Sequence, residues 1–243
     1  MKLKLCIMCS FYQVTFLYKS NLLVFYEATK QSFVFRKTGV FMKAETSSLD
    51  LHYIISELRF LVGSKVDKIY QEGKSMLLQL HVTSHGKKLL NIFAPQFFYL
   101  SSKKPDFPQT PGGFCMFLRK YLENTRIKNI KQIGFERIVE IEFESKEEIY
   151  KMIIELFSKG NIILCKDNYM IMSALETKTW SERTVRGGIK YEFPTKKYNV
   201  LKITEKELKD LIEKPLNIKE KLIEEFNFLN EKYIVRIITE EEK

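Results

Sequence analysis

The stretch from Lys131 to Phe143 constrains the fold most, because its second half alternates between apolar and acidic residues. Period-two alternation predicts a half-buried antiparallel strand, with one face against a core and the other toward solvent. The buried face would carry the apolar residues Val139, Ile141 and Phe143, and the solvent face the glutamates Glu140, Glu142 and Glu144. The charged pair Glu136–Arg137 precedes this strand, and the pattern alone favours a solvated turn there.

Around this strand, the sequence predicts two helices that are separated by runs of strands. Ser47 and Asp50 predict a capped helix over residues 47–62, which Gly63 ends. Residues 114–123 predict a second helix, after a loop over residues 103–113 that is rich in proline and glycine. We predict strands over residues 66–71, 76–82, 89–94, 97–100, 126–131, 137–144, 149–157, 161–166 and 169–175. This order predicts an α+β fold with two mostly antiparallel sheets and two packed helices.

Composition changes along the chain and indicates three segments. Residues 1–41 hold six basic residues and one acidic residue, which is half of the net charge of +10. We interpret this segment as an atypical N-terminal extension and Met42 as the natural start, with a genuine accessory segment as the alternative. Residues 42–200 form the main domain, and residues 201–243 predict a short helical segment. No apolar run reaches the length of about 18 residues that spans a bilayer, so we expect no membrane partner.

No residue pattern points to catalysis or to a bound cofactor. The three histidines have no partners at metal-ligand or triad spacing, and Cys6 and Cys9 form a lone C-x-x-C pair. We therefore expect no enzyme activity, no metal and no cofactor.

Basic residues gather instead in two stretches, residues 103–131 and residues 178–197, which suits contacts with RNA phosphates. A solvated surface is the alternative. The acidic stretch over residues 140–148 favours a one-sided positive surface.

Five ordered stretches resemble signature motifs of the NFACT family, the tail-elongating factors of ribosome quality control. Lys131-Gln-Ile-Gly-Phe-Glu-Arg-Ile-Val-Glu-Ile-Glu-Phe143 is similar to the family's Q-x-G-x-D-R-I-V-x-I-x-F signature. The other four are Ser47–Asp50 with Lys68–Gln71, Phe114–Lys120, Glu155–Leu156 with Lys159–Leu164, and Arg183–Gly188 with Tyr191 and Pro194. One departure is Glu136, where the family usually carries aspartate.

The resemblance implies a fold similar to the N-terminal domain of formamidopyrimidine-DNA glycosylases, followed by the start of a helix-hairpin-helix region. It implies a cytoplasmic factor that binds transfer RNA and the large ribosomal subunit with a stalled nascent chain and supports C-terminal tailing. The family's Asp-Arg pair, implicated in recognising transfer RNA, falls on Glu136 and Arg137. Weaker candidates for RNA-backbone contacts are Arg119, Lys120, Arg183 and Arg186. The family's coiled-coil arm and C-terminal module are missing, and a second polypeptide that supplies them is left open.

Two other classes of function are alternatives to a ribosome quality control factor. A surface-adhesion protein is suggested by the fibronectin-binding label attached to the family. A nucleic-acid enzyme of glycosylase-like fold is disfavoured, because those enzymes need an N-terminal proline followed by glutamate and this chain has no Pro-Glu dipeptide.

Overall fold

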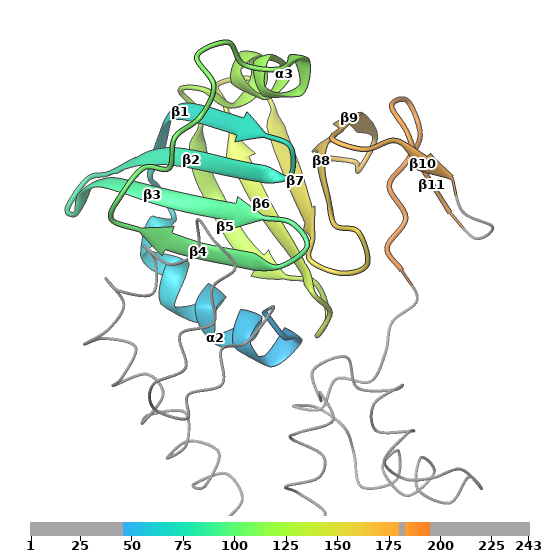
Figure 1. The fold of residues 1–243 in the computed structure, drawn as a ribbon, viewed down its shortest axis with the longest axis horizontal. Coiled ribbons are helices and arrows are strands. Elements are labelled where there is room, and N and C mark those ends of the chain that lie inside the picture. Colours follow the sequence, from blue (N-terminus) through green and yellow to red (C-terminus); the bar gives the residue numbers. More distant parts are fainter. Residues whose placement is uncertain (1–45, 180–182, 195–243) are drawn as a thin grey trace, which may run out of the picture. The chain divides into compact units, whose positions relative to one another are not determined.

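The computed structural model of the chain describes residues 46–179 and 183–194 (Figure 1). The expected extension over residues 1–41 and the helical segment over residues 201–243 both lie outside the described residues. The described part is mostly antiparallel sheet with two α-helices, which confirms the α+β class. The likeness to the glycosylase domain stays a prediction.

The first helix begins where the capping pattern predicts. Helix α2 (Ser48–Glu57) starts after Ser47, whose hydroxyl accepts from the Asp50 amide at 3.2 Å. The Asp50 carboxylate accepts in return from the Ser47 amide at 2.8 Å, so both halves of the capping box are present. The chain then tightens into the 3₁₀ helix η1 (Leu58–Leu61). The apolar residues Leu51, Ile55, Leu58 and Leu61 are buried, whereas Val62, inside the predicted helix range, lies past the helix and is 45% exposed.

Nine antiparallel strands form one sheet in the order β4-β3-β2-β1-β5-β6-β7-β8-β9. Helix α3 (Gly113–Leu122) lies in the connection between β4 and β5. A separate ribbon pairs β10 (Lys178–Thr179) with β11 (Thr184–Val185). The sheet strands are β1 (Lys65–Glu72), β2 (Ser75–Val82), β3 (Gly86–Phe93), β4 (Phe97–Ser101), β5 (Arg126–Gln132), β6 (Ile138–Glu144), β7 (Ile149–Glu155), β8 (Asn161–Lys166) and β9 (Ile171–Ala174).

The prediction of two sheets for the main body is wrong, because its two halves are joined through β1. Strand β1 pairs along its length with β2, but it also pairs with β5 at one position, Lys65 opposite Arg126. The halves β1–β4 and β5–β9 share one apolar core, to which Leu78 and Phe143 contribute from opposite halves. Helices α2 and α3 add Leu51 and Leu118 to this core, and in Figure 1 α3 lies above β1 and α2 lies below β4.

Strand β6 is buried on both faces in its first half, from Ile138 to Ile141. Val139, Ile141 and Phe143 are fully buried in the main core, as predicted. Glu140 is also fully buried, so the prediction of a solvent face is wrong at this position. The reason is that the chain after β8 folds back, and the Tyr169 hydroxyl donates to the Glu140 carboxylate at 3.1 Å.

Candidate functional site

Arg137 lies at the end of the sheet, one residue before β6. Its Nη2 donates to the carbonyl of Pro95, in the β3–β4 connection, at 3.1 Å. Its own carbonyl accepts from the Leu156 amide at 2.8 Å. The residue is half-buried. A backbone carbonyl 42 residues away in the sequence therefore orients the guanidinium.

Glu136 is held by the same turn. Its carbonyl accepts from Gln132 Nε2 at 2.9 Å, and its amide donates to the carbonyl of Ile133 at 3.1 Å. Gln132 Nε2 also donates to the carbonyl of Ser48 at 2.9 Å, which ties the turn to the first residue of α2. One amide side chain thus fixes the candidate pair relative to the helix.

Two further segments meet here and define what we call the Arg137 corner. The Thr46 amide donates to the carbonyl of Gln96 at 2.8 Å, so the chain entering α2 contacts the β3–β4 connection. Gly160, in the β7–β8 turn, lies so close to Pro95 that an added Cβ would come within 2.7 Å of its nitrogen. The Arg137 corner comprises Thr46–Ser48, Ala94–Gln96, Gln132–Arg137 and Gly160. Sequence reasoning placed these segments on separate elements and missed that they converge.

Arg119 and Lys120 lie on α3, and only one of them projects freely. Arg119 Nε donates to the carbonyl of Ile69 at 2.8 Å and lies 3.7 Å from a Glu123 carboxylate oxygen. Lys120 is exposed, with its Nζ 5.3 Å from the centroid of the Tyr121 ring. The geometry gives Arg119 a structural role in docking α3 on β1 and leaves Lys120 available to a partner.

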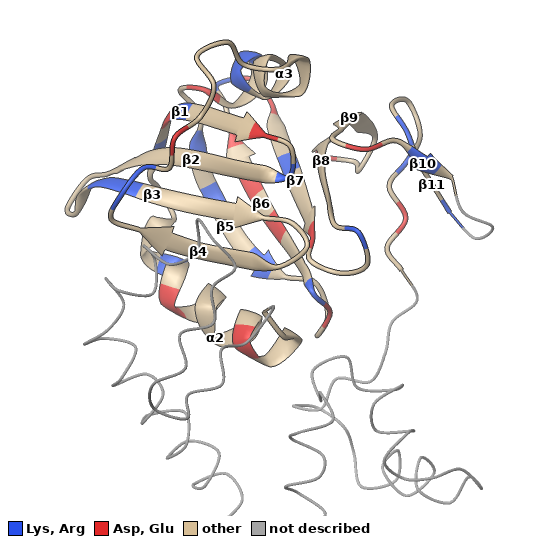
Figure 2. Ribbon diagram, viewed as in Figure 1, with Lys and Arg blue, Asp and Glu red and all other residues tan. Residues whose placement is uncertain are grey.

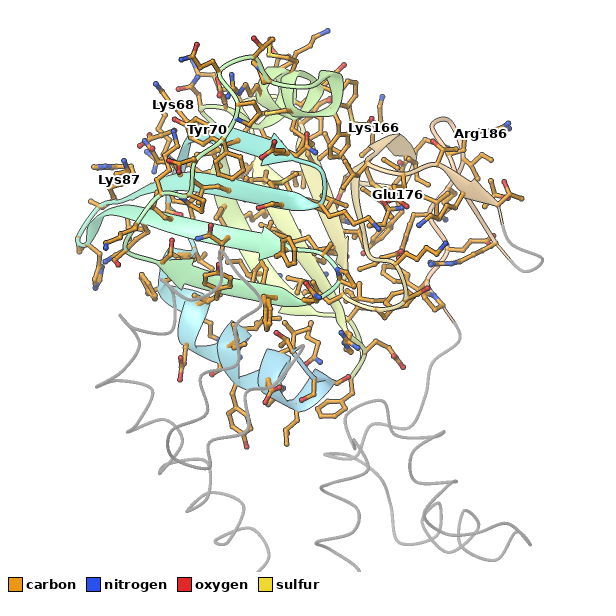
Figure 3. The ribbon with its side chains drawn as sticks, viewed as in Figure 1. Lys68, Tyr70, Lys87, Lys166, Glu176 and Arg186 are labelled. Carbon is orange, nitrogen blue, oxygen red and sulfur yellow. The ribbon has the colours of Figure 1, made fainter. Side chains whose placement is uncertain are left out.

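Arg183 lies in a buried network, contrary to the expectation of an exposed phosphate contact. Its Nη1 lies 2.8 Å from Glu155 Oε1, and its side chain is 13% exposed. The Tyr191 hydroxyl donates to the same carboxylate oxygen at 2.8 Å. Burial and the Glu155 carboxylate raise the pKa of Tyr191, so its hydroxyl stays protonated as the donor. Arg186, three residues on, is exposed and points outward (Figure 3).

The six candidates do not form a single site. Arg119 and Lys120 lie on α3, which packs against β1, whereas Arg137 lies in the corner that Gln132 ties to the start of α2. Arg183 and Arg186 flank β11 in the separate ribbon. Of these positions, the Arg137 corner is the one where several segments converge on a candidate residue.

The basic stretch over residues 103–131 is partly neutralised by the acidic stretch beside it. Lys131 Nζ lies 2.7 Å from Glu140 and 3.1 Å from Glu142, and Lys128 Nζ lies 3.4 Å from Glu144. Figure 2 shows the blue and red segments on neighbouring strands β5 and β6. The expectation that the acidic stretch leaves the positive charge one-sided is therefore wrong for these lysines.

Within residues 46–179 and 183–194, no cluster of three or more His, Cys, Asp or Glu residues could hold a metal ion. Over those residues, no helix has the length and apolar character needed to cross a membrane.

Comparison with known proteins identifies the class of this domain. The family model described as "NFACT N-terminal and middle domains" matches residues 47–242. The N-terminal domain of the fibronectin-binding protein PavA from Streptococcus pneumoniae superposes with a TM-score of 0.71 and 27% identity, over 81% of this chain and 80% of that one. The fibrinogen-binding protein from Staphylococcus aureus superposes with a TM-score of 0.67 and 28% identity, over 79% and 73% of the two chains.

The chain belongs to the NFACT family. It is 33% identical over 162 residues to the archaeal Rqc2 homolog aRqcH of Methanocaldococcus jannaschii, which covers 64% of this chain and 24% of that protein. It is 31% identical over 157 residues to the mouse ribosome quality control complex subunit NEMF, over 63% of this chain and 14% of that protein. The chain thus spans about a quarter or less of these two relatives.

Proposed function

We propose that this protein acts in ribosome-associated quality control, as a cytoplasmic factor that binds transfer RNA and the large ribosomal subunit carrying a stalled nascent chain. In this role it supports C-terminal tailing, while peptidyl transfer stays with the ribosome and the protein forms no bonds itself. The observation that carries the proposal is the match to relatives named as ribosome quality control factors over this domain.

We place the transfer-RNA contact at the Arg137 corner. The hydrogen bond to the Pro95 carbonyl orients the Arg137 guanidinium, and a guanidinium is a planar, rigid fork of N–H donors. The fork suits a paired contact with two acceptor atoms of a nucleotide, and Glu136 lies beside it. A bidentate contact to a base contributes about 1–3 kcal/mol of binding free energy.

The test is cosedimentation of the tagged full chain with purified large ribosomal subunits that carry peptidyl-transfer RNA. We expect the wild type to sediment with large subunits and to retain transfer RNA. Arg137→Ala should weaken transfer-RNA binding by about tenfold or more, as loss of a 1–3 kcal/mol contact implies. Arg137→Lys should restore it only in part, because an ammonium lacks the planar fork.

Two variants serve as controls in this experiment. Arg59→Ala removes the same charge from an exposed residue of η1 and should bind like the wild type. Glu136→Asp restores the family's usual residue and should bind as well as the wild type or better. Wild-type affinity in Arg137→Ala would move the contact away from the corner, and no cosedimentation of the wild type would reject the proposed function.

A second candidate function rests on the structural relatives described as fibronectin- and fibrinogen-binding proteins. Binding to immobilised fibronectin or fibrinogen, measured with the same full chain, tests it. Saturable binding there, together with no cosedimentation with ribosomal subunits, would favour adhesion over ribosome quality control.

A further inference from the structure

One end of the β1–β4 half carries a row of basic side chains that no single stretch of sequence reveals. Lys65 pairs directly with Arg126 on one side and with His81 on the other, and His81 pairs with Lys87. Directly paired residues point to the same face of a sheet, so the row crosses the four strands β5, β1, β2 and β3. With strands about 4.8 Å apart, it is about 14 Å long.

A β-bulge in β1 adds a further lysine to the same face. Val66 pairs with Leu80 and Lys68 with Gln79, so Asp67 is the extra residue between them. Because of this bulge, Lys65 and Lys68 share a face although they are three residues apart. In Figure 3, Lys68 and Lys87 lie on the same side of the ribbon.

Most of the lysine and arginine side chains in this row form no salt bridge among the described residues. Lys68, His81, Lys87 and Arg126 are exposed, and Lys65 is half-buried. Among the described residues, salt bridges are formed by the lysines Lys74, Lys128, Lys131, Lys151 and Lys178, and no salt bridge involves Lys65, Lys68 or Lys87. Arg126 Nη1 donates to the carbonyl of Gly63 at 2.9 Å. The nearest carboxylates in the register are Asp67 at the bulge and Glu144, which pairs with Arg126 across β5 and β6.

Like charges directly opposite one another destabilise a sheet. The like charges of Lys65 and Arg126, which lie opposite one another across β1 and β5, therefore repel. The negative charges of a bound polyanion would offset this repulsion. Each phosphate that is neutralised would also release a condensed counterion, which favours binding.

The Tyr70 ring is covered by neighbouring side chains and is not available to stack on a base. Lys104 Nζ lies 3.6 Å from the centroid of the Tyr70 ring, and Phe107 stacks on that ring with the centroids 5.7 Å apart. A ring covered in this way is not open to an incoming base. Lys104 itself is exposed and adds one more cation beside Lys68.

We propose that the basic row (Lys65, Lys68, His81, Lys87, Lys104 and Arg126) binds the phosphate backbone of an RNA helix without reading its bases. The choice of RNA among polyanions rests on the proposed function. This face is built from strands and lies apart from the Arg137 corner, so the two contacts are separable. Arg126 and Lys104 belonged to a stretch already expected to bind RNA, whereas Lys65, Lys68 and Lys87 are new.

The test is a titration of the full chain with a labelled RNA duplex of 16 base pairs, followed by fluorescence anisotropy over a series of potassium chloride concentrations. In Lys68→Gln with Lys87→Gln, we expect the slope of log K against log salt to flatten by about two. Lys68→Glu with Lys87→Glu should abolish binding. Both residues are exposed, and circular dichroism checks that the variants stay folded. A second duplex of unrelated sequence should bind with the same affinity, because phosphate contacts carry no base information.

The matched control is Lys146→Gln with Lys166→Gln, which removes two exposed lysines beside Glu147 and Asp167 and should leave the slope unchanged. An unchanged slope in the Lys68 and Lys87 variant, or equal flattening in the control, would overturn the basic row. Loss of binding to phosphatidylserine vesicles with no loss of RNA binding would assign the row to a membrane surface and also overturn the proposal. Failure of the wild type to sediment with ribosomes, with the salt-slope result intact, would reject the proposed function and leave the phosphate-binding row standing.

Discussion

Arg137 and Arg183 both lie in stretches that resemble family motifs, but their surroundings differ. We expect Arg137 to contact RNA and Arg183 to stabilise the fold. Arg137 is at the rim, where the Pro95 carbonyl holds one edge of its guanidinium. Arg183 is enclosed with Glu155 and Tyr191, and its side chain is 13% exposed. Adjacent charge in a sequence does not reveal whether an arginine faces solvent or a buried carboxylate.

We predict that Arg183→Ala destabilises the fold without changing RNA contacts of the folded protein. Removing one partner of a buried ion pair leaves Glu155 uncompensated, which costs about 3–5 kcal/mol. Chemical denaturation measures the free energy of unfolding. Arg183→Met with Glu155→Gln should lose less than the sum of the two single variants, because the two residues interact.

In the same ribbon, we predict that Arg186→Ala changes RNA binding and leaves the stability of the fold unchanged. An exposed arginine contributes little to stability, so the unfolding midpoint should stay within about 0.5 kcal/mol of the wild type. If Arg186 contacts a phosphate, the salt slope of RNA binding flattens by about one, whereas Arg183→Ala leaves it unchanged. A flattened slope in folded Arg183→Ala would mean that the buried pair opens when RNA binds.

Glycine is required at position 160 for two reasons, its left-handed backbone conformation and its close contact with Pro95. Its φ is +69°, and an added Cβ would come within 2.7 Å of Pro95 N and 2.8 Å of Ala94 C, both backbone atoms. We expect Gly160→Ala to lower the free energy of unfolding by about 2–5 kcal/mol, through left-handed strain and overpacking together. It should also weaken transfer-RNA binding, because Pro95 positions Arg137.

The matched control for this substitution is Gly73→Ala in the β1–β2 turn. Its φ is +54°, and among the described residues no atom lies within 4 Å of the added Cβ. The cost should therefore be about 1–2 kcal/mol, from left-handed strain alone. Equal losses of stability at the two glycines would show that the contact with Pro95 adds nothing.

At the scale of elements, strands β5 and β6 are joined by charge as well as by backbone hydrogen bonds. Lys131 lies opposite Glu140 in the register and contacts both Glu140 and Glu142. Burial raises the pKa of Glu142, but the hydrogen bond and charge of Lys131 outweigh burial, and the net pKa lies below the ordinary value of 4.5. A carboxyl whose pKa is lower in the folded state stabilises the fold above its unfolded pKa, and that stabilisation is lost as pH falls.

We predict that the free energy of unfolding declines as pH falls from 6 to 3, and that Glu142→Gln makes the decline shallower. The amide cannot titrate, so the part of the decline that belongs to Glu142 disappears. Urea denaturation at each pH measures the effect. Glu147→Gln, which removes an exposed carboxylate from the β6–β7 turn, is the control, and an equally shallow curve there would remove Glu142 from the explanation.

At the scale of the whole molecule, the described core is built from residues 46–194. The family match begins at residue 47, and all nine strands of the sheet and both described α-helices follow it. We predict that a chain beginning at Met42 keeps its melting temperature within a few degrees, because terminal segments contribute little unless they are tied to a core. Differential scanning calorimetry of the two chains measures this. Loss of folded protein on deletion would show that residues 1–41 belong to the fold.

The sequence by itself determined the α+β class, the capped start of α2, the positions of the nine strands and the buried face of β6. These follow from local periodicity and capping, which act over a few residues. It also carried the family resemblance, whose charged pair falls on Glu136 and Arg137.

Only the tertiary structure decided what depends on contacts between distant segments. The second half of β6 alternates, yet Glu140 is buried because Tyr169 folds over it from 29 residues away. Arg183 could be assigned to Glu155, and Lys68 to the face of Lys65 and Lys87, only through long-range pairing and a bulge. Alternation along a strand specifies its two faces, but which face meets solvent is set by the chain that packs against it.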